Sequence, residues 1–159
     1  MKKMMAVFCA VLAAIIFINA KPGQAVSTAK IYYVDRRMHR LVPMETRIKT
    51  SDTAECAEIV LKKLAEGRDS DEITRFIPPG SKIRVKEKNG TACVDLPSEI
   101  ARTIPKNREN EQLFVYQIVN SLTSIAGINS VTFSIDGKKT EKFMGFLNMR
   151  EIFTADYDM

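Results

Sequence analysis

Three aspartates stand at positions where catalytic carboxylates are often found. Asp35, Asp95 and Asp136 each follow a run of β-prone residues, so each is expected to end a strand. A carboxylate placed there can act as a general acid or base, and a hydrolase that uses these residues is one interpretation of the sequence. Aspartate is also a common turn and capping residue, and we favour that structural role. We therefore expect no catalytic residues and no enzymatic activity.

The single histidine, His39, lies in the segment Arg-Arg-Met-His-Arg at positions 36–40. A catalytic base needs a nucleophile or a carboxylate beside it, whereas its sequence neighbours are mostly cations, so we interpret His39 as a solvated turn residue. One histidine and no Cys-x-x-Cys pair leave no zinc motif. The sequence also has no Gly-rich phosphate loop and no Gly-x-Ser-x-Gly nucleophile motif. It thus predicts neither a metal nor a cofactor.

A basic strip is the clearest candidate for a binding surface. Its four cations alternate along one expected strand: Lys82, Arg84, Lys86 and Lys88. Because alternate residues of a strand share a face, the strip offers a ligand or partner surface for a protein or an anionic cell-wall polymer. Exposed cations also solvate a sheet face and discourage unwanted edge pairing. The acidic Glu87 beside the strip, and the lack of tryptophan for stacking on sugars, weaken the polymer interpretation.

The first 25 residues have the pattern of a secretory signal peptide. Lys2 and Lys3 precede an apolar run at positions 4–18, and Gly-Gln-Ala at 23–25 provides small residues before a cut at Val26. The run is shorter than the ~20 residues that cross a bilayer comfortably, so we favour cleavage over an N-terminal anchor. The rest is then expected outside the cytoplasm, secreted or membrane-associated, with membrane contact only through an uncleaved leader.

Composition and charge fit one globular domain after such a leader. The chain has 159 residues, of which 45% are hydrophobic and 27% charged, as in ordinary soluble domains. The formal charge of +5 includes three lysines of the leader and no leader acid, which leaves +2 for the remainder. So small a charge does not indicate a nucleic-acid partner.

Cys56 and Cys93 would lie in a compartment that permits a disulfide. Cys56 falls on the apolar side of an expected helix, while Cys93 alternates with Ala92 and Val94 on an expected strand. If Val94 faces the helices, Cys93 faces away. We therefore favour two separate buried thiols, since free cysteine often packs as a small apolar residue.

The elements that must position these residues follow the order β-β-α-β-β-α-β. Strands are expected at 30–34, 40–48, 82–88, 91–96 and 131–135, and helices at 52–66 and 109–126. Asn89-Gly90 predicts a tight hairpin, and Pro43 places its strand at an edge. From Thr140 a loosely patterned tail is expected to pack back, with one short strand. Together these elements predict an α+β two-layer sandwich, with two helices on one face of a mainly antiparallel sheet.

Four motifs occur in a fixed order along the chain. They are F-I-P-P-G-S-K-I from Phe76, A-C-V-D-L-P-S-E-I from Ala92, E-Q-L-F-V-Y-Q-I-V-N-S-L-T from Glu111 and V-T-F-S-I-D-G from Val131. In this order they resemble the GerMN domain of sporulation and spore germination proteins, and I-Y-Y-V-D from Ile31 fits its start. The resemblance covers residues 30–153. It implies a non-enzymatic extracytoplasmic module, similar to the ring-building motifs of sporulation and secretion complexes, and supplies no catalytic residues.

Such a module is expected to act through protein–protein contact in the cell envelope. A sandwich with helices on one sheet face leaves the other face and the sheet edges to solvent or to a partner. We expect the basic strip to solvate that face. The strand with Pro43 and the tail with Phe143, Phe146 and Phe153 then become the expected contact surfaces, for self-association or for an envelope partner.

Overall fold

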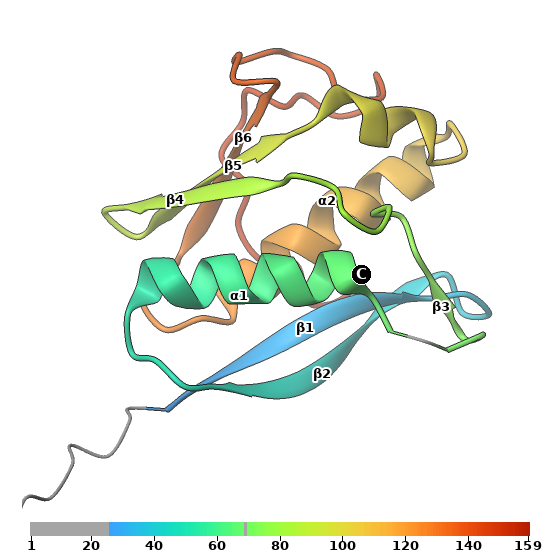
Figure 1. The fold of residues 1–159 in the computed structure, drawn as a ribbon. Coiled ribbons are helices and arrows are strands. Elements are labelled where there is room, and N and C mark those ends of the chain that lie inside the picture. Colours follow the sequence, from blue (N-terminus) through green and yellow to red (C-terminus); the bar gives the residue numbers. More distant parts are fainter. Residues whose placement is uncertain (1–25, 69) are drawn as a thin grey trace, which may run out of the picture.

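The computed structural model describes residues 26–68 and 70–159 (Figure 1). The elements in chain order are β1 (Ser27–Asp35), β2 (Arg40–Ile48), α1 (Thr53–Glu66), β3 (Ile73–Thr74), β4 (Arg84–Lys88), β5 (Thr91–Leu96), the 3-10 helix η1 (Ser98–Arg102), α2 (Arg108–Thr123) and β6 (Ser130–Ile135). The α+β class is as predicted. The predicted leader, residues 1–25, lies outside the described residues.

The strands form two three-stranded sheets where the sequence suggested one. Sheet A has the order β2-β1-β3 and is antiparallel, while sheet B has the order β4-β5-β6. In sheet B, β4 and β5 are antiparallel, and β6 runs parallel to β5 after a crossover through α2. Hairpin patterns specify which strands are neighbours but not whether two hairpins share a sheet, so this division was not visible in the sequence.

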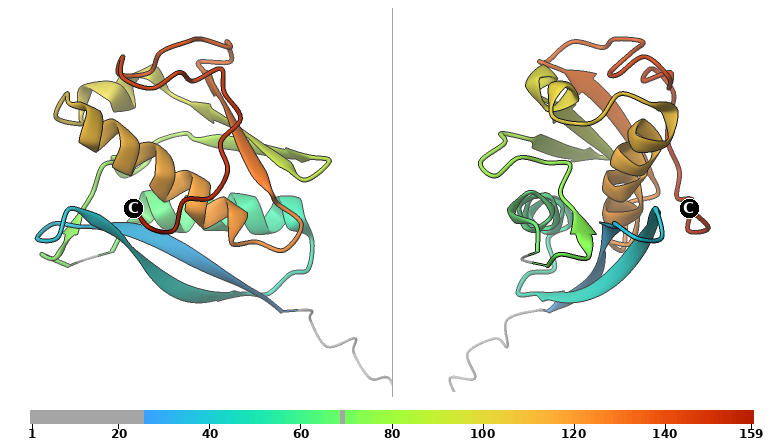
Figure 2. Two further views of the ribbon diagram at one scale, coloured as in Figure 1. Left: turned by 180° about the vertical axis from the view of Figure 1, so that it is seen from behind. Right: turned by 90° about the vertical axis from the view of Figure 1, so that its right-hand side faces the viewer.

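The two helices lie between the sheets (Figures 1 and 2). Helix α1 contacts β1 of sheet A and β4 of sheet B, while α2 contacts β1 and β6. One continuous apolar core fills this space. On α2 the apolar residues at helical spacing, Val115, Ile118, Val119 and Leu122, are fully buried. Ala126, which the sequence predicts at the end of this helix, lies beyond it and is exposed. Burying both helices against two sheets gives this small domain more apolar contact than a two-layer arrangement would.

Local chemistry explains where α1 begins and ends. The carboxylate of Asp52 accepts a 2.8 Å hydrogen bond from the Glu55 amide, as expected of an N-cap. Gly67 ends the helix with φ at 67° and donates to the carbonyls of Leu64 and Lys63. The positive φ favours glycine at this position, because other residues are strained in that conformation.

The hairpins also follow their sequence signals. Asn89 and Gly90 have φ of 52° and 77° between β4 and β5, the left-handed conformation of a type I′ turn. Pro43 lies on β2, which is an edge strand of sheet A as predicted. Lys82, by contrast, precedes β4, which begins at Arg84.

The region after β6 has no further strand among the described residues. Its predicted short strand is reduced to a single antiparallel bridge between Val131 and Phe153. Helix α2 ends at Thr123, four residues before Gly127, and the hydroxyl of the next residue, Ser124, accepts a hydrogen bond from the Lys30 amide of β1. These departures all depend on contacts between distant parts of the chain.

Candidate partner-binding site

The three strand-end aspartates do not form one site. Asp35 lies in the β1–β2 turn of sheet A, where its carboxylate accepts 2.8 Å hydrogen bonds from the Arg37 and Met38 amides. Asp95 and Asp136 lie in and after strands of sheet B. Asp35 and Asp136 have the turn role that we favoured from the sequence. Asp95 instead lies within β5 and accepts hydrogen bonds from Arg84, Ser134 and the Gly137 amide.

The same contacts keep these carboxylates ionised. The hydrogen bond from the Met38 amide is the largest influence on the pKa of Asp35, which lies below its usual value. Burial acts to raise the pKa of Asp95, but hydrogen bonds from Ser134 and Arg84 outweigh it and lower that pKa. The Ser98 hydroxyl and amide lower the pKa of Asp136. A general acid needs a raised pKa at neutral pH, so none of the three fits that role.

His39 is a solvated turn residue, as predicted. Its ring is 64% exposed, and its Nδ1 lies 3.8 Å from a carboxylate oxygen of Glu109. Among the described residues, no group of three or more histidine, cysteine, aspartate and glutamate side chains is placed to hold a metal ion.

The two cysteines in the described part of the chain are unpaired, as favoured from the sequence, but only one of them is buried. Cys56 is buried on α1, whereas Cys93 is exposed on β5. The prediction of two buried thiols is thus wrong for Cys93, because sheet B has an outer face that no other layer covers. The alternation with Ala92 and Val94, both buried, already placed Cys93 on that face.

The basic strip lies on the outer face of sheet B. Its four side chains, Lys82, Arg84, Lys86 and Lys88, are all exposed. Among the described residues, Arg84 is the one member of the strip with an ion pair, to the carboxylate of Asp95 on the neighbouring strand. The strand register places Lys86 beside Cys93 and Lys88 beside Thr91. The lysine ammonium groups therefore remain available to an anionic partner.

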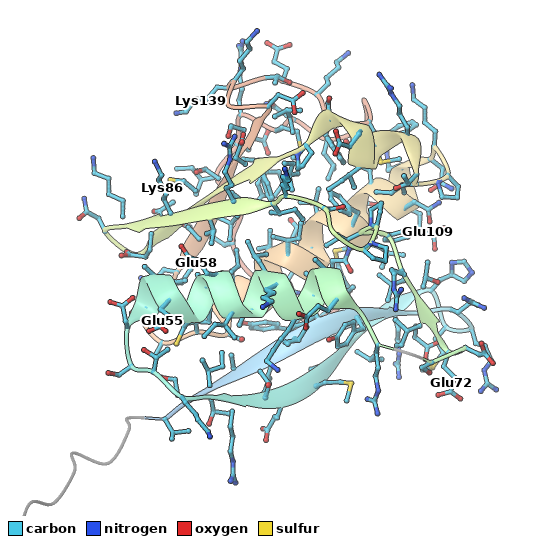
Figure 3. The ribbon with its side chains drawn as sticks, in the orientation of Figure 1. Glu55, Glu58, Glu72, Lys86, Glu109 and Lys139 are labelled. Carbon is cyan, nitrogen blue, oxygen red and sulfur yellow. The ribbon has the colours of Figure 1, made fainter. Side chains whose placement is uncertain are left out.

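An open groove of about 870 Å³ separates β4 from α1. Its apolar lining includes Leu61 and Ala65 of α1, together with Ile83 and Val85 on the β4 side. Charged side chains surround it, among them Glu58, Lys62, Glu66, Arg75, Arg84 and Lys86. Figure 3 shows Glu58 extending from α1 toward β4, and Lys86 pointing away from α1. The groove thus joins an apolar floor to one end of the basic strip.

Sequence reasoning missed the polar residues of α2 that hold the C-terminal tail. The carboxylate of Glu111 is fully buried and accepts hydrogen bonds from the amides of Met144, Phe146 and Leu147, at 2.7–3.1 Å. The side-chain oxygen of Asn120 accepts from the Asp156 amide at 3.0 Å. Glu111 lies four residues before Val115 on the buried stripe, and this helical spacing was the available signal.

The tail is consequently less exposed than expected. Phe153 is buried and packs edge to face against Phe133, and Phe143 stacks on Phe114 of α2 at 5.1 Å between ring centroids. Only Phe146, at 36% exposure, remains open among the three phenylalanines expected to form a contact surface. The expectation is therefore corrected for Phe153, which belongs to the core, while Phe143 is half-buried against it.

Comparison with known proteins identifies the family. A family model named Germane, described as sporulation and spore germination, matches residues 30–141. The chain belongs to the Germane family. This confirms the identification made from the motifs, and the GerMN name applies to the domain from here on. No curated protein matches the chain in a sequence comparison.

Solved structures share the GerMN fold at low sequence identity. The first GerMN domain of the sporulation protein GerM from Bacillus subtilis is 18% identical, with a TM-score of 0.58, over 83% of this chain and 98% of that one. The structure of the tandem GerMN domains of the same protein is 19% identical, with a TM-score of 0.63, over 82% of this chain and 46% of that one. A Clostridium perfringens protein with a provisional lipoprotein description is 16% identical, with a TM-score of 0.57, over 82% of this chain and 88% of that one. These likenesses concern the fold. No helix in the described part of the chain is long and apolar enough to cross a membrane.

Proposed function

We propose that this GerMN protein is exported and works by protein–protein contact in the cell envelope, without catalysis, during sporulation or spore germination. The observation that carries the proposal is the family match over residues 30–141, whose description is sporulation and spore germination. The lipoprotein description of the Clostridium perfringens neighbour supports an envelope location. The structural use of Asp35, Asp95 and Asp136 supports a role without catalysis.

Crosslinking in sporulating cells tests this function directly. Cells that produce the full chain are expected to give envelope complexes that contain it, and deletion of its gene is expected to lower spore yield or germination rate. Substitution of all three aspartates by asparagine is expected to leave the spore phenotype unchanged wherever the protein still folds. Normal sporulation and germination in the deletion strain, with the chain found only as a monomer, would contradict the proposal.

Export is tested separately, by the N-terminus of the mature protein. We expect mass spectrometry of the envelope fraction to find a mature chain that begins at Val26, because small residues at positions 23 and 25 fit signal peptidase cleavage. An intact Met1 in that fraction would indicate an uncleaved anchor instead of a signal peptide.

Binding of an anionic cell-wall polymer is a second candidate function. The exposed ammonium groups of Lys82, Lys86 and Lys88 on one sheet face favour it. Charge-driven binding weakens as salt screens the charges. A pull-down on purified wall polymer should therefore lose the protein between about 0.05 and 0.5 M salt if this function holds, and retention independent of salt would exclude it.

A further inference from the structure

The edges of sheet A are protected against pairing with another strand. On β2, the Leu41 amide donates to the Met159 carbonyl at 3.1 Å, so the tail already occupies that position. Two residues along, on the same side of the strand, Pro43 has no N–H to offer. Native proteins use proline and covering segments in this way to prevent edge association. The edge of β2 therefore presents no continuous ladder.

The opposite edge of sheet A is covered by a short strand and by two side chains of α2. The two-residue strand β3 pairs with the end of β1. Farther along β1, the amides of Lys30 and Tyr32 donate to the hydroxyls of Ser124 and Ser121 on α2, at 2.8 and 2.9 Å. Two helix side chains thus take the place that a neighbouring strand would occupy.

In sheet B the β6 edge is also occupied. The backbones of Val131 and Phe153 exchange two hydrogen bonds of 2.8 Å. At the other end of the strand, the Ile135 amide donates to the Lys138 carbonyl at 2.9 Å. Both ends of β6 are therefore paired by the chain that follows it.

The edge of β4 (Arg84–Lys88) has no proline, and no other described segment pairs with it. In a two-residue hairpin the pair that flanks the turn is hydrogen-bonded, and the pattern then alternates. With Lys88 opposite Thr91, Lys88 and Lys86 direct their backbone groups to β5. Val85 and Glu87 direct theirs outward. Among the hydrogen bonds of the described residues, none reaches the backbone N–H or C=O of these two.

The groove lies beside this open edge. Val85 and Ile83 line it from the strand side, while Leu61 and Ala65 line it from α1. An added strand would direct every second side chain toward these apolar groups and the others toward the outer face. On that outer face it would lie next to the ammonium groups of the basic strip, including Lys86.

We propose that β4 accepts an extended segment of a partner protein as an added strand, and that this segment alternates acidic with apolar residues. The proposal rests on the proposed function and specifies how contact is made. Apolar side chains enter the groove, while acidic side chains lie opposite Arg84, Lys86 and Lys88, since opposite charges across strands are stabilising. Backbone hydrogen bonds to Val85 and Glu87 supply affinity, and the alternation supplies specificity.

A second copy of this chain fits the edge less well than an acidic partner. Pairing of β4 with β4 would bring two sets of exposed cations together on the same face, and like charges directly opposite are destabilising. The charge pattern of the strand therefore selects a partner of opposite sign and disfavours self-pairing through this edge.

Two matched variants at Glu87 test whether its outward backbone amide binds the partner. Both Glu87→Ala and Glu87→Pro lose the 2.7 Å hydrogen bond from the Gly90 amide to the Glu87 carboxylate, but only proline also removes the outward N–H. The probe is an eight-residue peptide that alternates glutamate and valine. We expect the full chain with Glu87→Pro to bind it about ten-fold or more weakly than Glu87→Ala does.

Two comparison peptides test the pattern. One has the same composition with four glutamates followed by four valines, and the other alternates lysine with valine. Both are expected to bind the unmodified chain about ten-fold or more weakly than the glutamate–valine alternation. Equal affinity for all three peptides, or equal affinity of the two Glu87 variants, would overturn the proposal. Binding of the alternating peptide only through dimers of this chain would indicate self-pairing and would also overturn it.

Two further tests of strand addition, charge reversal and amide hydrogen exchange, do not require that the protein folds with proline at position 87. Lys86→Glu is expected to weaken binding of the glutamate–valine peptide, whereas Lys139→Glu, an exposed position after β6, is expected to leave it unchanged. On peptide binding, exchange of the Val85 and Glu87 amides should slow about ten-fold or more while that of Lys86 stays the same. Slowing at Lys86, or none at Val85 and Glu87, would contradict the register.

Failure of this inference is distinguishable from failure of the proposed function. Envelope crosslinks of the unmodified chain, together with a spore defect in the deletion strain, would support the proposed function. If Glu87→Pro and Glu87→Ala then give the same crosslinks and the same spore phenotype, the protein acts through another surface and the β4 inference is wrong. If the deletion strain sporulates and germinates normally, the proposed function fails whatever the peptide binds.

Discussion

The edges of the two sheets differ, although each sheet contains a β-hairpin. In sheet A, the tail, Pro43 and two serines of α2 occupy or interrupt the edges. In sheet B, β6 is paired by the following chain while β4 is left open beside a groove. Since an open edge invites association, we infer that the β4 edge has a use. In the proposed interaction, sheet B carries the binding surface and sheet A does not.

The largest expected effect comes from the core that both sheets share. Leu122 on α2 is fully buried between them. We expect Leu122→Ala to lower the free energy of unfolding by about 2–5 kcal/mol, the range for a buried leucine. Denaturant unfolding measures this. A midpoint that does not change would mean that α2 is not held between two sheets.

The Glu111 carboxylate holds the tail that borders both sheets. Removing it in Glu111→Ala leaves three tail amides without their acceptor, and each unsatisfied buried group costs about 1–3 kcal/mol. Since two of the three amides are only partly buried, we expect a total loss of about 2–4 kcal/mol. Glu111→Gln keeps one acceptor oxygen and should lose less. Equal stability of the two variants would show that the tail does not depend on this residue.

The double variant Ser121→Ala, Ser124→Ala removes the cover from the β1 edge. We expect it to cost about 1–3 kcal/mol, because two backbone amides lose their acceptors. It should also increase concentration-dependent association, since sheet A then has an open edge like that of β4. Sedimentation measures the association. Thr123→Ala is the control, because the Thr123 hydroxyl bonds only to carbonyls of its own helix. Association that stays at the level of the control would contradict the covering role of the serines.

The smallest expected effect is on the pH dependence of stability, through Asp95. The folded-state pKa of Asp95 lies below its usual value, so its contribution to stability is present above about pH 4 and is lost as pH falls through the lowered folded pKa. We expect Asp95→Asn to cost about 0.5–1 kcal/mol at neutral pH, since its Arg84 partner is largely exposed. The cost should disappear at about pH 2. A penalty that is the same at both pH values would mean that the ionised carboxylate is not the stabilising form.

Local sequence chemistry determined much of this fold. The Asn89-Gly90 turn occurs where the sequence placed it, and α1 begins and ends within one residue of the expected range 52–66. Each depends on the conformational preference of one or two residues, or on a hydrogen bond within a few residues. The exposed cations of β4 were predictable for the same reason, because alternation along a strand is a local property.

Tertiary structure decided what depends on residues far apart in the chain. Glu111 meets the Met144 amide across 33 residues, and Ser121 meets Tyr32 across 89. Helical spacing places these polar side chains on the buried face of α2, but the sequence does not show which distant amide each one meets. The separation into two sheets, the exposure of Cys93 and the open edge of β4 likewise depend on which surfaces meet. Only the packed chain specifies those contacts, because burial and edge pairing are properties of the neighbours that folding brings to a residue.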